Sequence, residues 1–419
     1  MHSIDHLIIG AGVSGLATAN FLPPGAQWEI LEREAEPGGY CRTVQQDGFV
    51  WDYSGHFFHF RQPEVEAFLV ERMADPDIRK VTKRSRVLHG DRLVDFPFQK
   101  NIHQLPRADF MECLRDLVFR DEGGTSDSFE EMLYARLGRS ITEMFLKPYN
   151  EKLYACALSE LDADAMGRFF PHANLEDIVR NMSTPDNESY NTTFTYPSGG
   201  AIQYIEALLH DLDPERIHLG ESLESVDLAN RIAHTNRREI RYNHLISSMP
   251  LPRLLSAASV SHSPELYTWN KVLVFNLGFD RKGWDVDHWV YVPDPDCCFY
   301  RVGFYDNIFD TDRMSLYVEI GLPADAPVDM EARLAEVLED LEKCGIVSGH
   351  ALVSHHSVVL NPAYVHVHRR GQEDVLEKLA LLRGANVHSI GRYGGWKYCA
   401  IEDNIVEARS LAARLGEVA

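Results

Sequence analysis

The chain has 419 residues, too many for one simple core, so two or three lobes are expected. Its 45% hydrophobic and 25% charged residues are typical of a globular protein, which excludes low-complexity and fibrous classes. The 41 basic and 63 acidic residues give a net charge of −22, which argues against a nucleic-acid scaffold because phosphate backbones need a basic face.

The first 32 residues predict a strand, a glycine turn, a helix and a second strand. The apolar run Leu7–Ile9 leads into Gly10-Ala11-Gly12-Val13-Ser14-Gly15, and Glu32 follows Gly10 by 22 residues. In a G-x-G-x-x-G motif, backbone N–H groups and a helix N-terminus approach a pyrophosphate, while the later acid accepts ribose hydroxyls. Because the flanking elements are all present, they favour dinucleotide binding over a plain structural turn.

The segment Gly38-Gly39-Tyr40-Cys41-Arg42 follows the second strand and favours FAD over NAD. Its glycines let the chain pass close to a cofactor, and Arg42 is able to donate two hydrogen bonds to a phosphate. A surface salt bridge is the alternative interpretation of Arg42.

The middle of the chain predicts two inserted lobes. Residues 83–98 hold short apolar runs typical of strands, and the apolar period becomes helical from about 106 to 183. Within the second stretch, Ser128-Phe129-Glu130-Glu131 indicates a capped helix start. Residues 270–322 predict aromatic-rich antiparallel strands, and a helix is expected near 328–344.

Two later segments return to the cofactor domain. His244–Ser248 indicates a buried strand, and Val387–Gly394, followed by a helix from about Asp403 to Leu415, would supply the second half of a flavin site. The predicted fold is therefore α/β, a Rossmann-like FAD-binding domain with an inserted helical lobe and an antiparallel β-sheet lobe. The expected bounds are 1–82, 190–250 and 345–419 for the FAD-binding domain, 106–189 for the helical lobe, and 83–105 with 251–344 for the sheet lobe.

The cysteines and the apolar runs bear on location. The seven cysteines form no C-x-x-C pair, which suits free thiols in a reducing compartment. No run approaches the roughly 20 apolar residues of a membrane helix, and no signal peptide precedes the first strand. We therefore expect a cytoplasmic protein without a membrane span, and no metal site.

Further motifs carry a resemblance to a known family. They are Trp51–His59, Phe96–Gln99, Pro148–Tyr154, Phe299–Arg301 and Gly391–Tyr398. With the flavin motifs, they resemble the UDP-galactopyranose mutases, flavoenzymes within the wider amine-oxidase-like FAD superfamily. The resemblance spans nearly the whole chain, and its later motifs are the more specific ones.

This resemblance implies an intramolecular transferase or isomerase that depends on reduced FAD. Such a mutase interconverts the pyranose and furanose forms of a nucleotide sugar, here expected to be UDP-linked. The reduced flavin attacks the anomeric carbon and expels the nucleotide, without net oxidation. A flavin reductant such as NAD(P)H is implied as well, and a homo-oligomer is left open.

The resemblance also implies roles for individual residues. Arg301 is expected to hold the departing diphosphate, while Gly55 and His56 lie beside the flavin ring. An outward strand position is the alternative for Arg301, and an ordinary structural histidine for His56. The expected cofactor contacts are Gly10, Gly12, Ser14, Gly15, Glu32, Gly39, Tyr40, Arg42, Gly55, His56, Gly391, Arg392, Asp403 and Asn404. The expected substrate contacts are Phe98, Gln99, Asn150, Tyr154, Arg168, Asn191, Tyr291, Arg301, Tyr364 and Tyr398.

The chain departs from the family pattern at the second phosphate-binding arginine. That position falls on Phe169 or His172 here, and Arg168 is the nearest arginine. Either Arg168 serves through a local shift, or the diphosphate is held differently. For the tyrosines, a half-buried core position is the alternative, and simple N-capping is the alternative for Asp403 and Asn404.

Two other functions are consistent with the sequence. The superfamily-wide flavin motifs also suit an amine-oxidase-like or desaturase-like oxidoreductase that acts on an amine or an apolar ring system. The departure at the second arginine, and Tyr154 where the family usually has a tryptophan, suit a flavin-binding protein without catalysis.

Overall fold

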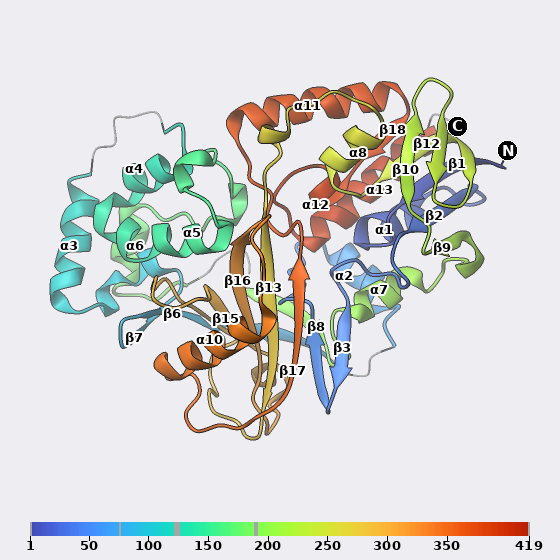
Figure 1. The fold of residues 1–419 in the computed structure, drawn as a ribbon. Helices are drawn as coiled ribbons and strands as arrows, with labels where there is room; N and C mark the ends of the chain where they lie inside the picture. Colours follow the sequence, from blue (N-terminus) through green and yellow to red (C-terminus); the bar gives the residue numbers. More distant parts are fainter. Residues whose placement is uncertain (1, 75–76, 121–125, 188–191, 418–419) are drawn as a thin grey trace.

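The computed structural model describes residues 2–74, 77–120, 126–187 and 192–417, and three regions meet at the centre of the molecule (Figure 1). They are a sheet covered by helices on both faces, a mainly antiparallel sheet, and a helical lobe. The α/β fold expected from the sequence is confirmed.

The first sheet has the strand order β10-β11-β12-β1-β2-β9, and β18 also pairs with β12. Five strands run parallel: β1 (His2–Ile9), β2 (Trp28–Glu32), β9 (Ile217–Leu219), β12 (Glu239–Ser247) and β18 (Val387–Ser389). An antiparallel edge completes the sheet with β10 (Leu223–Asp227) and β11 (Ile232–Thr235). The predicted strands at the first glycine turn, at Glu32 and at 244–248 all belong to this sheet.

Helices cover both faces of this sheet, which explains the continuous apolar run of β1. Ile8 packs in a core with α1, α7 and α13, whereas Leu7 and Ile9 pack in a second core with α8 and α11. A strand that is buried on both faces needs apolar residues at successive positions. The helices are α1 (Val13–Phe21), α7 (Ile202–Leu209), α8 (Leu251–Ala257), α11 (Arg369–Gly384) and α13 (Ile401–Glu417).

The second sheet has the order β17-β13-β16-β15-β14-β6-β7, and its pairs are antiparallel except β14 with β6. Helix α10 (Met330–Lys343) covers one face, and the helical lobe lies against the other (Figure 1). Along β16, Val318 faces α10, so its neighbours Tyr317 and Glu319 point to the opposite face. The strands are β6 (Ser85–His89), β7 (Arg92–Asp95), β13 (Asn270–Phe279), β14 (Trp289–Tyr291), β15 (Arg301–Phe304), β16 (Ser315–Pro323) and β17 (Leu352–Leu360).

Two segments lie in a different region from the expected one. Strand β17 pairs along β13, so residues 352–360 belong to the second sheet and not to the FAD-binding domain. Helix α8, expected in the sheet lobe, packs in the core of the first sheet. The periodicity of a strand or helix does not reveal which distant element it packs against. The lobes predicted for β17 and α8 from the sequence are therefore wrong.

The helical lobe contains α3 (Arg107–Val118), α4 (Phe129–Ile141), α5 (Lys147–Tyr154) and α6 (Leu175–Asn181). The predicted start of α4 is confirmed, because the Ser128 hydroxyl accepts the Glu131 N–H at 3.2 Å in a capping box. Smaller elements link the regions. They are the hairpin β3 (Thr43–Gln46) with β4 (Phe49–Asp52), the pair β5 (Ile78–Thr82) with β8 (Thr193–Pro197), and the helices α2 (Pro63–Val70), α9 (Asp306–Phe309) and α12 (Gly391–Gly394).

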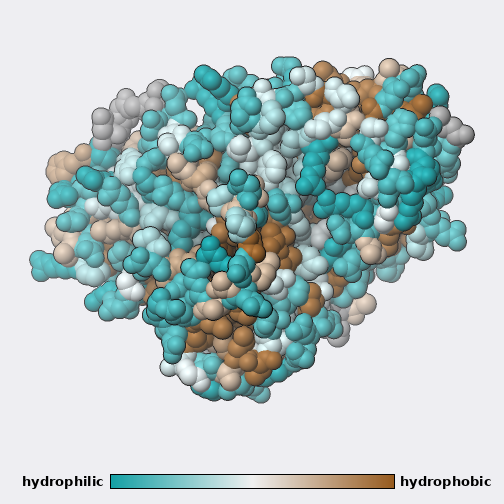
Figure 2. Space-filling view, viewed as in Figure 1, coloured by the Kyte–Doolittle hydropathy of each residue, from teal (hydrophilic) through white to brown (hydrophobic). Residues whose placement is uncertain are grey.

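The visible surface is mostly hydrophilic, with apolar residues gathered near the middle of the view over the second sheet (Figure 2). Within the described residues, every helix is too short or too polar to span a bilayer.

Candidate functional site

A cavity lies where the three regions meet. Much of its wall comes from the turn after β4, strands β15 and β16, the segment after β17, and the stretch between β18 and α13. Its lining includes Tyr40, Ser54, Gly55, His56, Phe57, His59, Phe169, Trp289, Tyr300, Arg301, Tyr317, Glu319, Tyr364, Arg392, Tyr393, Tyr398 and Cys399.

The glycine turn beside this cavity is dictated by steric constraints. Gly10 has φ +102°, and a Cβ atom on Gly15 would lie 1.9 Å from the carbonyl oxygen of Gly10. A Cβ atom on Gly39 would lie 3.5 Å from the Gly12 Cα, so the two glycine motifs approach each other through bare backbone. Gly12 precedes α1 without a side-chain cap, which leaves the first N–H groups of α1 available to an anion.

Glu32 braces this turn. Its buried carboxylate accepts the Ala11 N–H at 2.8 Å and the Glu34 N–H at 3.0 Å. Each carboxylate oxygen still has a lone pair that a ribose hydroxyl is able to use.

Arg42 holds the second glycine motif. Its guanidinium donates to the carbonyl oxygens of Pro37, at 3.2 Å, and Glu36, and it lies 3.5 Å from the Glu36 carboxylate. These contacts agree with the salt-bridge interpretation of Arg42, and they place its charge beside the Gly38-Gly39 turn.

The first and last parts of the chain meet at Ser14. The Asn404 side-chain oxygen accepts the Ser14 hydroxyl at 3.3 Å and the Arg392 backbone N–H at 2.9 Å. Asp403 accepts the Ala400 N–H at 2.8 Å, so this side chain caps the start of α13, as its alternative interpretation held. The expected second half of the flavin site therefore lies next to the first.

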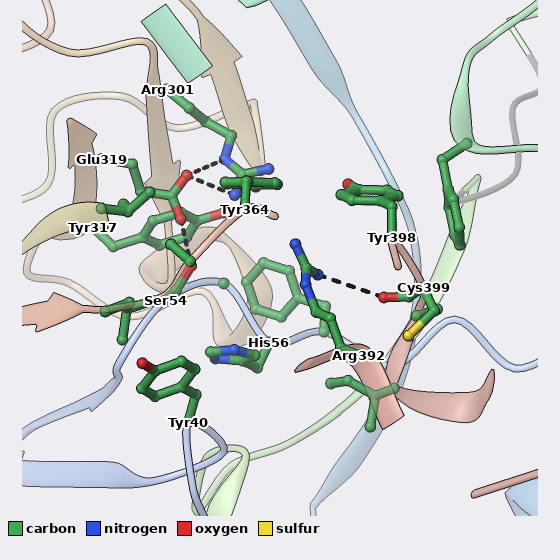
Figure 3. Close-up of a pocket in the computed structure, with 18 of the residues that line it drawn as sticks. Tyr40, Ser54, His56, Arg301, Tyr317, Glu319, Tyr364, Arg392, Tyr398 and Cys399 are labelled. Atoms are coloured by element: carbon green, nitrogen blue, oxygen red, sulfur yellow. Dashed lines mark hydrogen bonds and ion pairs between the residues drawn. The ribbon is translucent and has the colours of Figure 1, made fainter. Parts of the chain in front are cut away.

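Arg392 extends into the cavity between two tyrosines (Figure 3). Its guanidinium carbon lies 5.0 Å from the ring centre of Tyr364 and 4.8 Å from that of Tyr398, and the two rings stack at 5.9 Å. The Nε atom is buried and has no hydrogen-bond partner among the described residues. A buried donor without a partner is costly, so a bound group is expected to accept from it.

His56 lies on the opposite side of the cavity from Tyr398 (Figure 3), and the preceding residue, Gly55, also lines the cavity. Burial, reinforced by the charge of Arg392, lowers the pKa of His56 to about 4, so its ring is neutral near pH 7. Its Nδ1 atom is buried and unbonded within the described part of the chain. A Cβ atom on Gly55 would lie 2.4 Å from the Tyr317 hydroxyl, so this turn packs tightly on β16.

Arg301 lines the cavity and pairs with a buried carboxylate. Its Nε and Nη2 atoms both lie 2.6 Å from Oε2 of Glu319, which is only 1% exposed. The second oxygen of Glu319 accepts the Ser54 hydroxyl. Sequence reasoning missed Glu319, although an acidic residue in the apolar run 315–323 is a signal, because a buried charge needs a partner.

Five expected substrate contacts lie outside the cavity lining, in the core shared by the helical lobe and the second sheet. Gln99, Asn150 and Tyr154 each have a buried oxygen that lacks a hydrogen-bond partner in the described ranges. The Tyr154 ring lies 5.7 Å from Tyr364, just behind the cavity wall. The other two are Phe98, which packs on Phe145, and Tyr291, whose hydroxyl accepts the Trp289 N–H at 2.6 Å. Asn191 lies outside the described residues.

At the departure from the family pattern, Phe169 and not Arg168 lines the cavity. The Phe169 ring packs edge-on against Tyr398 at 4.9 Å. Arg168 instead donates to both carboxylate oxygens of Asp403, at 2.7 and 2.6 Å. His172 lies next to Arg136, with 2.8 Å between their nitrogens.

These features fit a flavin dinucleotide. The glycine turn and the first turn of α1 offer backbone N–H groups to a pyrophosphate, and Glu32 offers oxygens to a ribose. The unpaired nitrogens of His56 and Arg392 lie in the cavity next to the glycine turn. The flavin ring system would contact them there.

Comparison with known proteins agrees with this arrangement. A family model described as flavin containing amine oxidoreductase matches residues 13–415. A probable UDP-galactopyranose mutase of Klebsiella pneumoniae is 26% identical over 270 residues, or 61% of this chain and 63% of that protein. The chain therefore spans less than two thirds of the length of this curated relative.

Solved structures show the same fold. The crystal structure of reduced UDP-galactopyranose mutase superposes with a TM-score of 0.90 at 24% identity, covering 99% of this chain and 96% of that one. A putative protoporphyrinogen oxidase from Exiguobacterium sp. 255-15 has a TM-score of 0.79 at 17% identity and covers 100% of both chains.

Proposed function

The chain belongs to the flavin-containing amine oxidoreductase family, and we propose that this member is a reduced-FAD-dependent mutase of nucleotide sugars. It interconverts the pyranose and furanose forms of a sugar linked to UDP or a related nucleotide. The cytoplasm is its proposed setting, with NAD(P)H as the flavin reductant, and the seven free cysteines are consistent with this.

The pairing of Arg301 with Glu319 inside the cavity carries this proposal. One edge of the guanidinium is bonded to Glu319, and the remaining N–H groups face a cavity that also holds Tyr364 and Tyr398. A planar guanidinium suits phosphate oxygens, and tyrosine hydroxyls are neutral donors for a leaving group that gains charge. An oxidase for amines or apolar rings has no need of such a donor set.

The residues of the chain would bind and orient the substrate. Arg301 holds the diphosphate, the stacked tyrosines donate to its oxygens, and the neutral ring of His56 offers a hydrogen bond without adding charge. When bound and reduced, FAD supplies the nucleophile for the anomeric carbon. Since Phe169 occupies the wall where the family has a second arginine, the diphosphate is held by Arg301 and neutral donors.

Incubation of the reduced, FAD-loaded protein with UDP-galactofuranose or UDP-galactopyranose tests the proposal. We expect chromatography to show interconversion, with Arg301→Lys strongly impaired. Absence of interconversion for these and other nucleotide sugars, together with absence of UDP binding by calorimetry, would contradict the mutase function.

An oxidoreductase is the second candidate, because the aromatic residues Phe57, Phe169 and Trp289 line the cavity. Such an enzyme would show substrate-driven flavin reduction by an amine or an apolar ring compound that survives in Arg301→Lys. Anaerobic mixing of the oxidised protein with such compounds, followed at the flavin absorption band, separates the two candidates.

A further inference from the structure

Glu319 joins two parts of the cavity that are far apart in the chain. Its Oε2 atom accepts from Arg301 on the neighbouring strand, and its Oε1 atom accepts from the Ser54 hydroxyl on the turn after β4 (Figure 3). Ser54 directly precedes Gly55 and His56. The same face of β16 carries Tyr317, which packs against Gly55. Strand β16 thus contacts both the arginine and the turn.

The negative charge of Glu319 shows that this residue does not serve to strengthen phosphate binding. A carboxylate beside an anion-binding arginine reduces the attraction of that arginine for phosphate. Burying it also costs free energy that only well-placed donors offset. Its geometry favours orientation instead, because Nε and Nη2 are fixed on one oxygen, which leaves the opposite edge of the guanidinium toward the cavity.

We propose that Glu319 is a positioning residue that couples Arg301 to the segment Ser54–His56. A ligand that binds the Arg301 guanidinium displaces the Glu319 carboxylate. Because Glu319 also bonds Ser54, this displacement moves the turn that carries His56. Binding of the phosphate group is therefore reported at the flavin ring. This inference rests on the proposed function, since it takes Arg301 as the anion-binding group.

A titration of the FAD-loaded full chain with UDP tests the coupling. Calorimetry gives the affinity, and the flavin difference spectrum at saturation gives the response at the ring. In Ser54→Ala, which keeps the Arg301–Glu319 pair, we expect UDP affinity within about threefold of the parent and a spectral amplitude reduced by roughly half or more. Glu319→Gln, which has a similar shape without the charge, should also lose amplitude.

The control is Ser256→Ala on α8, whose hydroxyl donates to the Pro252 carbonyl oxygen in the same helix and lies outside the cavity lining. It should keep both the affinity and the amplitude. If Ser54→Ala and Glu319→Gln bind UDP and retain the full amplitude of the parent, the coupling is overturned.

A measurement without any nucleotide separates this inference from the mutase function. The flavin reduction potential is determined for the parent, Arg301→Lys, Ser54→Ala and the double variant. Coupling through Glu319 predicts that the shift caused by Arg301→Lys is reduced by roughly half or more in the Ser54→Ala background. Additive shifts overturn the coupling even if UDP binds, and non-additive shifts support it even if UDP does not bind.

Discussion

The two sides of the cavity are built by different means. The cradle around Gly10, Gly15 and Gly39 consists of backbone, and its shape follows from steric limits within a short stretch of sequence. The wall around Arg301 consists of side chains, and Arg301, Glu319 and Ser54 bond one another from three separate segments of the chain. We therefore expect a single added Cβ atom in the cradle to abolish FAD binding. Single substitutions in the wall should reduce ligand affinity or stability only in part.

The largest effect is expected when the cradle is changed. In Gly15→Ala, the new Cβ would lie 1.9 Å from a backbone oxygen that has little room to move. We expect the protein to lose its FAD and about 3 kcal/mol or more of stability, measured as the flavin-to-protein ratio and by urea unfolding. The control Gly384→Ala should retain FAD, because its Cβ would meet no described atom within 4 Å apart from its chain neighbours and its own helix backbone.

A smaller loss is expected at the wall. Arg301→Lys keeps the positive charge beside Glu319 but loses the planar fork, so UDP affinity should fall about tenfold, or about 1.4 kcal/mol, while FAD stays bound. Calorimetry with UDP measures this change. Arg139→Lys, at an exposed position, serves as the control. Equal UDP affinities for the two variants would show that Arg301 does not bind the phosphate groups.

The wall should also respond to acid. The pKa of His56 is lowered from its ordinary value of 6.5 to about 4 by burial, so below pH 6.5 the unfolded chain takes up a proton that the folded chain does not. Stability contributed by this neutral ring is complete above pH 6.5 and is lost as the pH falls toward 4.

In His56→Asn, we expect the fall in unfolding free energy between pH 7 and pH 5 to shrink by about 2 kcal/mol. Urea unfolding at both pH values measures this difference. Replacing the exposed His210 by Asn is the control, and an unchanged pH dependence in His56→Asn would show that the ring is not held neutral.

The smallest effect is expected for the ion pair beside the cavity. Arg168→Met breaks the ion pair with Asp403. Because both side chains of this pair are partly exposed, the free energy of unfolding should change by less than about 1 kcal/mol. UDP affinity should stay within about threefold of the parent, because Phe169 and not Arg168 lines the cavity. A tenfold loss of UDP affinity would instead show that Arg168 reaches the diphosphate.

The same contrast explains what the sequence was able to predict. The glycine turn, Glu32 at the end of its strand and the return of residues 387–404 depend on local patterns, and the structure has all of them. The partner of Arg301, the contact between Arg168 and Asp403 across 235 residues, and the sheet that β17 joins depend on long-range pairing. A single sequence holds no direct record of such pairings, although the acid in the apolar strand β16 signalled that a partner was needed.

The hydrogen bond between Ser14 and Asn404, which joins positions 390 residues apart, has a consequence for biosynthesis. A growing chain that still lacks its last helix has the phosphate-binding turn but not the residues that close the site behind it. We therefore expect FAD to bind only after residue 404 has been synthesised. Chains that end before this residue would lack bound flavin and its yellow colour.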